Sequence, residues 1–221
     1  MSHGGAMELY QVLLAAYGRQ KWWPADSALA MMAGAILVQN TAWTGAARAV
    51  QRLAEAGLLE AAALRQVDDE RLWERIRPAG YFRVKGQRLR ALATFLADYG
   101  DNCQRLFRLE TTELRNALLK VHGIGKETAD SIVCYGGGRA IFVVDAYTRR
   151  LFHRLGWSSA KADYDQLQQL VMGTVPPEAD MLAEFHALIV RHAKNHCRSK
   201  PLCHGCPVVF CPGHSFPQGR E

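Results

Sequence analysis

LLKVHGIGKETAD, residues 118–130, is the stretch of sequence that decides the fold. Gly123 and Gly125 stand two apart between two segments of helical pattern, and the backbone can turn tightly there because glycine has no side chain. The N–H groups that begin the second helix, with the charge of Lys126 beside them, are suited to bind a phosphate. Ile124 would anchor the turn in the core. An ordinary helix–helix turn is the plainer alternative, and Gly-x-Gly alone does not exclude it.

A second informative segment is VVDAYTRR, residues 143–150, in which Asp145 lies twenty positions after Gly125. Asp145 directly follows an apolar run and is expected to begin a helix. Aspartate is favoured at the N-cap of a helix, so capping is the plain explanation for its presence. The alternative is that its carboxylate carries chemistry.

Two further motifs favour chemistry: LVQNT at residues 37–41 and GYFRVK at residues 80–85. Together with the hairpin and the segment 143–150, they resemble the helix-hairpin-helix DNA glycosylase superfamily of the endonuclease III type. That family carries its catalytic aspartate in a Val-Asp-x-His/Tyr-x-x-Arg segment after the hairpin. The likeness extends over nearly the whole chain. It implies base excision repair as the function, and double-stranded DNA with a damaged base as the partner.

The resemblance also assigns roles to individual residues. An enzyme that acts on a base must take that base out of the stack. Asp145 would then face the C1′ carbon, stabilise positive charge on the sugar as the base leaves, and orient or deprotonate a water. Gln39 would fill the gap in the duplex, and Tyr81 would act as a wedge. The expected DNA-binding residues are Gly123, Gly125, Lys126, Gln39, Tyr81 and Lys85.

One position of the hairpin bears on the reaction. Bifunctional members of the family use a hairpin lysine that attacks C1′ as an amine nucleophile. The aligned position holds Glu127 here, and Lys126 is one residue early, which is a rotation of about 100° on a helix. We therefore predict a monofunctional glycosylase without an efficient lyase step. Lys126 reaching in, and Glu127 acting as a secondary acid, stay open.

Two rival functions also stay open. The nearer one is a glycosylase with abasic-site lyase activity on oxidised pyrimidines. The one from another class is a DNA-structure-binding protein that has lost catalysis, against which the presence of Asp145 speaks.

Four cysteines, Cys197, Cys203, Cys206 and Cys211, form C-x5-C-x2-C-x4-C. Thiolates packed this closely can hold one iron–sulfur cluster or one zinc ion. Relatives of endonuclease III carry a [4Fe–4S] cluster on C-x6-C-x2-C-x5-C, so the resemblance favours the cluster over zinc, with two gaps each one residue shorter. Cys103 and Cys134 lie in apolar helical contexts and are expected to be core thiols.

An aromatic set indicates the base that is bound. Trp22, Trp23 and Pro24 precede the first apolar helix, and Trp43 follows the QNT turn. Core packing is the ordinary role of tryptophan, but aromatic faces also suit a planar base, and a cationic base better still. The set resembles the 3-methyladenine glycosylase branch of the superfamily, which implies an alkylated purine as substrate. That branch need not carry a cluster, so the chain combines features of two branches.

Composition agrees with a globular nucleic-acid-binding protein. The chain has 221 residues, 49% of them hydrophobic, and 27 Lys and Arg against 21 Asp and Glu, for a net charge of +6. A generic basic soluble protein would have the same composition. No apolar run is long enough to span a bilayer, so no membrane partner is expected. We expect a cytoplasmic monomer with reduced thiols, associated with the nucleoid if the source is bacterial.

The fold class predicted from hydrophobic periodicity is all-α, in a two-lobed endonuclease III-like arrangement. One lobe, residues 25–138, would be a helical barrel ending in the hairpin. The other, residues 1–24 with 139–221, would carry the iron–sulfur loop 197–211. Residues 140–144 are expected to be an extended lead-in rather than a strand. Helices are predicted over residues 7–17, 27–38, 44–56, 58–66, 69–76, 85–99, 111–121, 126–135, from 145 onward, 164–171 and 179–194.

Overall fold

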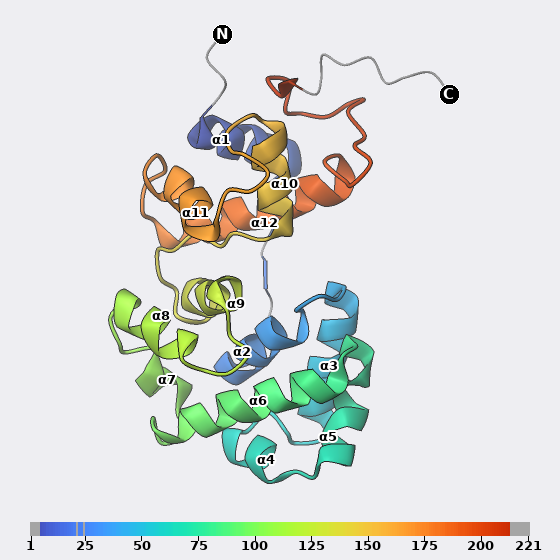
Figure 1. The fold of residues 1–221 in the computed structure, drawn as a ribbon, viewed down its shortest axis with the longest axis vertical. Helices are drawn as coiled ribbons and strands as arrows, with labels where there is room; N and C mark the ends of the chain where they lie inside the picture. The colour runs from blue at the N-terminus through green and yellow to red at the C-terminus, as the bar shows by residue number, and fades with distance from the viewer. Residues whose placement is uncertain (1–4, 21, 24, 213–221) are drawn as a thin grey trace. The chain divides into compact units, whose positions relative to one another are not determined.

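The computed structural model describes residues 5–20, 22–23 and 25–212. Within these ranges the regular structure is entirely helical, which confirms the predicted all-α class (Figure 1). No helix in the described ranges is both long enough and apolar enough to cross a membrane. The helices are α1 (Ala6–Tyr17), α2 (Ala28–Leu37), α3 (Trp43–Glu55), α4 (Ala61–Gln66), α5 (Asp69–Ile76), the 3₁₀ helix η1 (Arg77–Ala79), α6 (Phe82–Ala97), α7 (Cys103–Leu106), α8 (Thr111–Leu119), α9 (Lys126–Ser131), the π-helix η2 (Ile132–Gly136), α10 (Ala146–Arg154), α11 (Tyr164–Met172) and α12 (Ala179–Asn195).

The chain separates into two compact units. One unit is the continuous stretch Trp23–Arg139 and holds α2 to α9 with η1 and η2. The other combines the chain up to Trp22 with the chain from Ala140 onward, and it holds α1, α10, α11 and α12.

The Trp23–Arg139 unit is built around α2, in which every residue after Ala28 is buried. Helix α2 contacts α3, α6 and η2, while α6 also packs on α4 and α5 (Figure 1). Ser27 caps α2 by accepting a hydrogen bond from the Ala30 N–H at 3.1 Å. An almost wholly apolar helix is stable in this position because other helices cover it all round.

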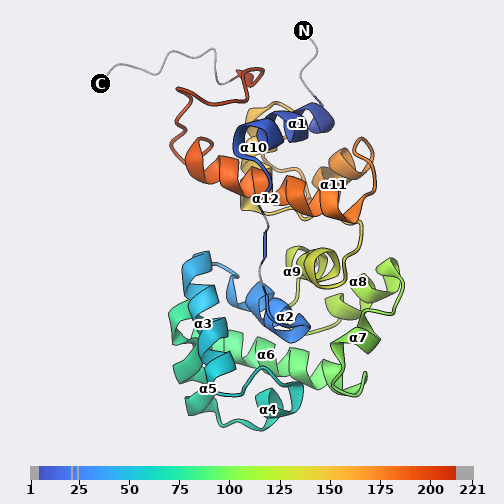
Figure 2. The same cartoon turned by 180° about the vertical axis from the view of Figure 1, so that it is seen from behind.

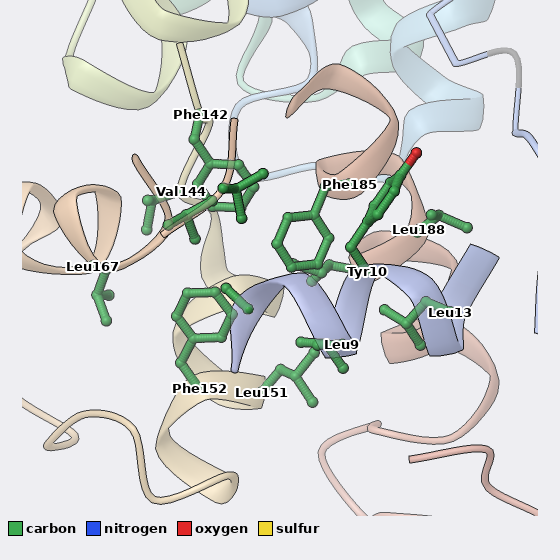
Figure 3. Packing of buried hydrophobic residues seen from close by; sticks show 14 of the residues in the cluster. Leu9, Tyr10, Leu13, Phe142, Val144, Leu151, Phe152, Leu167, Phe185 and Leu188 are labelled. Atoms are coloured by element: carbon green, nitrogen blue, oxygen red, sulfur yellow. The ribbon is translucent and has the colours of Figure 1, made fainter. Parts of the chain in front are cut away.

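The second unit is organised by α12, which packs against both α1 and α10 (Figures 1 and 2). Its core brings residues from both ends of the chain together, as Figure 3 shows for Leu9 of α1, Phe152 of α10 and Phe185 of α12. Each of these three side chains is fully buried, and burial of this size contributes about 1.5–3 kcal/mol per side chain. The core therefore holds α10 firmly against α12.

Most predicted helices are confirmed to within a few residues, and two features differ. The four-residue α7 was not predicted, because a single turn capped by Asn102 shows no periodicity. The helix predicted over 126–135 changes at Ile132 into the π-helix η2, an irregularity that is often found at functional sites. Residues 141–144 form no strand, as expected, and Asp145 itself is extended, with φ −110° and ψ −176°.

Candidate active site

Asp145 stands at the N-cap of α10. Its Oδ1 accepts hydrogen bonds from the Thr148 N–H at 2.7 Å and from the Thr148 hydroxyl at 2.9 Å. The capping role considered from the sequence is therefore real. Capping uses Oδ1 of the carboxylate and leaves Oδ2 for other contacts.

His186 of α12 approaches that second oxygen, with Nε2 3.5 Å from Asp145 Oδ2. Burial by itself raises the pKa of the Asp145 carboxyl, but His186 and the hydrogen bonds from Thr148 outweigh it and leave the pKa below its usual value. Asp145 is only 8% exposed, yet the carboxylate form is the stable one. A buried anion with a lowered pKa can face positive charge on a sugar without first losing a proton.

The hairpin between α8 and α9 is shaped around Gly123, whose φ of +84° favours glycine. Space is a second requirement, because a Cβ at Gly123 would lie 2.2 Å from Arg88 Cγ. Arg88 donates a hydrogen bond to Gln39 Oε1. Gln39 Nε2 in turn donates to the Gly123 carbonyl at 3.0 Å and to Thr128 Oγ1 at 2.8 Å. Gln39, which follows α2, therefore holds the turn directly, and Arg88 of α6 holds Gln39.

Gly125, the N-cap of α9, presents open space, with no atom within 4 Å of where a Cβ would stand. Lys126 and Glu127 follow it and are both exposed. Ile124 between the glycines is buried, as expected for the anchor of the turn. This arrangement has the geometry in which the N–H groups of a helix start can meet an anion.

The turn before α6 requires a correction. Lys85, predicted to contact DNA, is 1% exposed and donates to the carbonyls of Leu37 at 2.8 Å and Ala79 at 2.6 Å. Burial, with a smaller effect of the Arg88 charge, lowers the pKa of Lys85 to about 8. The ammonium group satisfies carbonyls that the ends of α2 and η1 leave open, so Lys85 holds the turn from inside.

Tyr81, at the tip of the same turn, is 71% exposed and has a left-handed φ of +45°. A left-handed φ is uncommon for a bulky residue, and strained backbone positions of this kind cluster at active and binding sites. Its exposure is compatible with the predicted wedge.

The predicted aromatic set is divided in the structure. Trp23 stacks on Tyr135, with ring centroids 5.2 Å apart, and meets Trp43 edge-on at 5.1 Å. Trp22 belongs to the other unit, where Lys194 Nζ lies 5.5 Å from its ring. Pro24 lies outside the described residues. Tyr135, which comes from η2, completes a half-buried aromatic cluster made of Trp23, Trp43 and Tyr135.

The four cysteines of the C-terminal segment line one cavity of about 360 Å³, together with residues of α10 and α12. Burial, with smaller contributions from the three other thiols, raises the pKa of the Cys206 thiol to about 11. Within the described residues, no three His, Cys, Asp or Glu side chains are gathered closely enough to share a single metal ion.

Two arginines of α10 fasten this cysteine segment. Arg154 donates to Cys197 Sγ at 3.2 Å and to the carbonyls of Arg198 at 2.6 Å and Ser199 at 2.9 Å. Arg150 donates to the Cys197 carbonyl at 2.8 Å. The helix that Asp145 caps at one end therefore holds the cysteine segment at the other.

Several of these residues were not identified from the sequence. Thr148 could have been found, because it stands three positions after the N-cap, where a capping bond is expected. His186, Arg88 and Tyr135 give no local signal, since each reaches its partner through the tertiary fold.

Comparison with known proteins agrees with these features. Residues 33–177 match the model of the HhH-GPD superfamily of base excision DNA repair proteins. A protein of Methanocaldococcus jannaschii, provisionally named a DNA repair glycosylase, is 42% identical over 92% of this chain and 94% of its own. Endonuclease III of Sulfolobus acidocaldarius is 27% identical over 78% of this chain and 76% of its own.

Two solved structures resemble the fold. The 3-methyladenine DNA glycosylase of Helicobacter pylori, bound to 1,N6-ethenoadenine, aligns with a TM-score of 0.74 and 25% identity, over 86% of this chain and 98% of that one. A trapped endonuclease III–DNA covalent intermediate aligns with a TM-score of 0.82 and 19% identity, over 96% of each chain.

The chain therefore belongs to the HhH-GPD superfamily of base excision DNA repair proteins. Within base excision repair, its activity is that of a DNA glycosylase.

Proposed function

We propose that this glycosylase is monofunctional, and that it hydrolyses the N-glycosidic bond of alkylated purines with Asp145 as the catalytic residue. The observation that carries the proposal is the Asp145 carboxylate, which is buried and yet has a lowered pKa because of Thr148 and His186. Such a group stabilises the positive charge that develops on the sugar as the base leaves. It can also orient the attacking water or accept its proton.

DNA binding is assigned to the hairpin. Gly123 fixes the shape of the turn, Gly125 leaves room for a phosphate, and Lys126 adds charge on the exposed side. Contacts of this kind position a duplex without reading its sequence. Gln39 is proposed to fill the gap that the flipped base leaves in the duplex, and Tyr81 is proposed to act as a wedge. Gln39 must then exchange its hydrogen bonds to the hairpin for contacts with DNA.

The substrate class is supported by the aromatic cluster of Trp23, Trp43 and Tyr135. Aromatic faces attract cations, and an N-alkylated purine is cationic. Such a base is already a good leaving group, so one carboxylate can suffice without a strong general acid. The Helicobacter pylori relative, which is named a 3-methyladenine glycosylase, agrees with this assignment.

The absence of an efficient lyase step is inferred from the hairpin. Glu127 occupies the position expected for a nucleophilic lysine, and a carboxylate cannot form a Schiff base. The second candidate function, a glycosylase and lyase on oxidised pyrimidines, is favoured by the endonuclease III relatives and requires Lys126 to act as the nucleophile. Lys126 is exposed, so its reach can be tested directly.

A [4Fe–4S] cluster is the proposed cofactor, held by Cys197, Cys203, Cys206 and Cys211. The fit rests on the cavity: all four cysteines line one space of about 360 Å³. When bound, such a cluster supplies one-electron redox chemistry and thiolate bonds that cross-link the segment.

A panel of duplexes with alkylated, oxidised and deaminated bases tests the function, with base release and strand cleavage scored separately. We expect release of alkylated purines by the wild type and loss of release in Asp145→Asn. Full release by Asp145→Asn would refute the catalytic assignment and favour a DNA-binding role. A borohydride-trapped adduct with abasic DNA that disappears in Lys126→Ala would establish the lyase instead.

A further inference from the structure

His186 is the residue of α12 that approaches the Asp145 carboxylate. Its neighbours along α12, Phe185 and the residues 187–190, are all buried, and His186 itself is only 5% exposed. Figure 3 shows Phe185 and Leu188 of the same helix inside the hydrophobic core. An imidazole buried among apolar side chains is costly unless its nitrogens have polar partners. Nε2 stands 3.5 Å from Oδ2 of the Asp145 carboxylate, an ion-pair distance at which the geometry falls short of a hydrogen bond.

The contact is directed at a particular oxygen. Thr148 supplies two hydrogen bonds to Oδ1, through its N–H and its hydroxyl, while His186 Nε2 lies 3.5 Å from Oδ2. This distance is long for a hydrogen bond, and catalytic hydrogen bonds in enzymes without substrate are often long. Donors on both oxygens fix the plane of a carboxylate, whereas donors on Oδ1 alone leave Oδ2 free to swing.

We propose that His186 is a positioning residue that donates its Nε2–H to Asp145 Oδ2 and holds the carboxylate ionised and in one orientation for catalysis. The proposal rests on the proposed function, in which Asp145 is the catalytic residue. A carboxylate can accept about four hydrogen bonds in all. The three donors named here therefore leave one acceptor direction on Oδ2 for the reacting water or sugar.

The surroundings favour His186 as the group that controls Asp145. Among the described residues, His186 is the only one whose charge lowers the pKa of Asp145. Thr148, on α10, is uncharged. Tyr164 of α11 is a further titratable group nearby, and its hydroxyl accepts a hydrogen bond at 3.3 Å from the N–H of Val144, the residue before Asp145. Replacing His186 should therefore act on Asp145 directly.

Two variants separate positioning from packing. His186→Leu keeps the volume and removes the donor, whereas His186→Gln keeps an N–H donor at a similar reach. Leu188→Ala, in the same helix and fully buried, is the control for loss of core packing. Each full-length protein is tested with duplex DNA treated with a methylating agent. Released 3-methyladenine is measured in a single turnover with enzyme in excess, across a range of pH, alongside the affinity for abasic DNA and the melting temperature.

We expect His186→Leu to slow base release about 10- to 100-fold, the effect of losing a hydrogen bond to a charged group. DNA affinity should stay within about threefold, a small free-energy change. The acid limb of the rate profile should move to higher pH, because loss of the donor raises the pKa of Asp145. His186→Gln should recover most of the rate, and Leu188→Ala should lower the melting temperature without moving the acid limb.

The proposal is overturned if His186→Leu keeps the wild-type rate and acid limb, or if His186→Gln is impaired equally. It is also overturned if Leu188→Ala reproduces the shift of the acid limb. Failure of the proposed function is separately visible, because Asp145→Asn would then release base as fast as the wild type, and the positioning role would fall with it.

Discussion

Gly123→Ala should destabilise the hairpin for two reasons that the structure separates. The left-handed φ of +84° costs a residue with a Cβ about 1–2 kcal/mol. The new methyl group would also stand 2.2 Å from Arg88 Cγ, so the arginine must move and give up its hydrogen bond to Gln39. A hydrogen bond from a charged donor is worth about 1.5–3 kcal/mol.

The free-energy cost of losing this hydrogen bond is partly offset, because the long Arg88 side chain can turn toward solvent and be hydrated there. We therefore expect a net destabilisation of about 2–4 kcal/mol, which corresponds to a fall in melting temperature of about 4–16 °C for a chain of this size. Circular dichroism melts and urea unfolding measure both quantities.

Gly125→Ala is the matched control, two residues away. Gly125 has an ordinary φ of −90° and open space at its Cβ position. Its effect on stability should stay within about 1 kcal/mol, since restricting the unfolded chain offsets the small loss at the N-cap. Its methyl group does stand where a phosphate is proposed to bind, so DNA affinity should fall. Equal loss of stability in the two variants would refute the reasoning.

Three further outcomes follow from the buried contacts. The folded state lowers the pKa of Lys85 to about 8 from 10.5, so the unfolded chain binds more protons between these two values. The free energy of unfolding of the wild type should therefore rise from pH 8 to pH 10.5 relative to that of Lys85→Met, as measured by urea unfolding. If the proposed iron–sulfur cluster is bound, Arg154→Ala should accelerate iron loss to a chelator severalfold, because Arg154 donates to Cys197 Sγ, whereas Arg149→Ala, on the same helix, should not; equal rates would contradict the role of Arg154 in holding the cysteine segment. Arg115→Ala removes the guanidinium 2.6 Å from the fully buried Asp130 and should cost about 3–5 kcal/mol in urea unfolding, while an unchanged midpoint would show the pair to be dispensable.

Local patterns account for what could be predicted from the sequence. The helix predicted over Asp69–Ile76 has the bounds of α5, and the apolar character of residues 27–38 indicated a helix covered on all sides, which is α2. The residue before α10 was expected to begin a helix and does so. These features depend on neighbours within about one helical turn, which a sequence displays directly.

Long-range contacts account for what could not be predicted. Lys85 was expected to bind DNA because of its place in the GYFRVK motif, but a carbonyl 48 positions away accepts a hydrogen bond from its ammonium group. Trp22 and Trp23 are adjacent in sequence and belong to different units. His186 is 41 positions from Asp145 and reaches it only because α10 and α12 pack together.

Helix α10 sets the distance between the Asp145 carboxylate at one end and the cysteine segment at the other. Asp145, the N-cap before its first turn, reaches His186 of α12, and Arg154, its last residue, donates to Cys197 of the cysteine segment. Inserting or deleting one residue between them would rotate one end relative to the other by about 100° and shift it by about 1.5 Å. Relatives should therefore differ in the spacing of their cysteines, which lie in a loop, and keep the distance along the chain from the aspartate to the arginine unchanged.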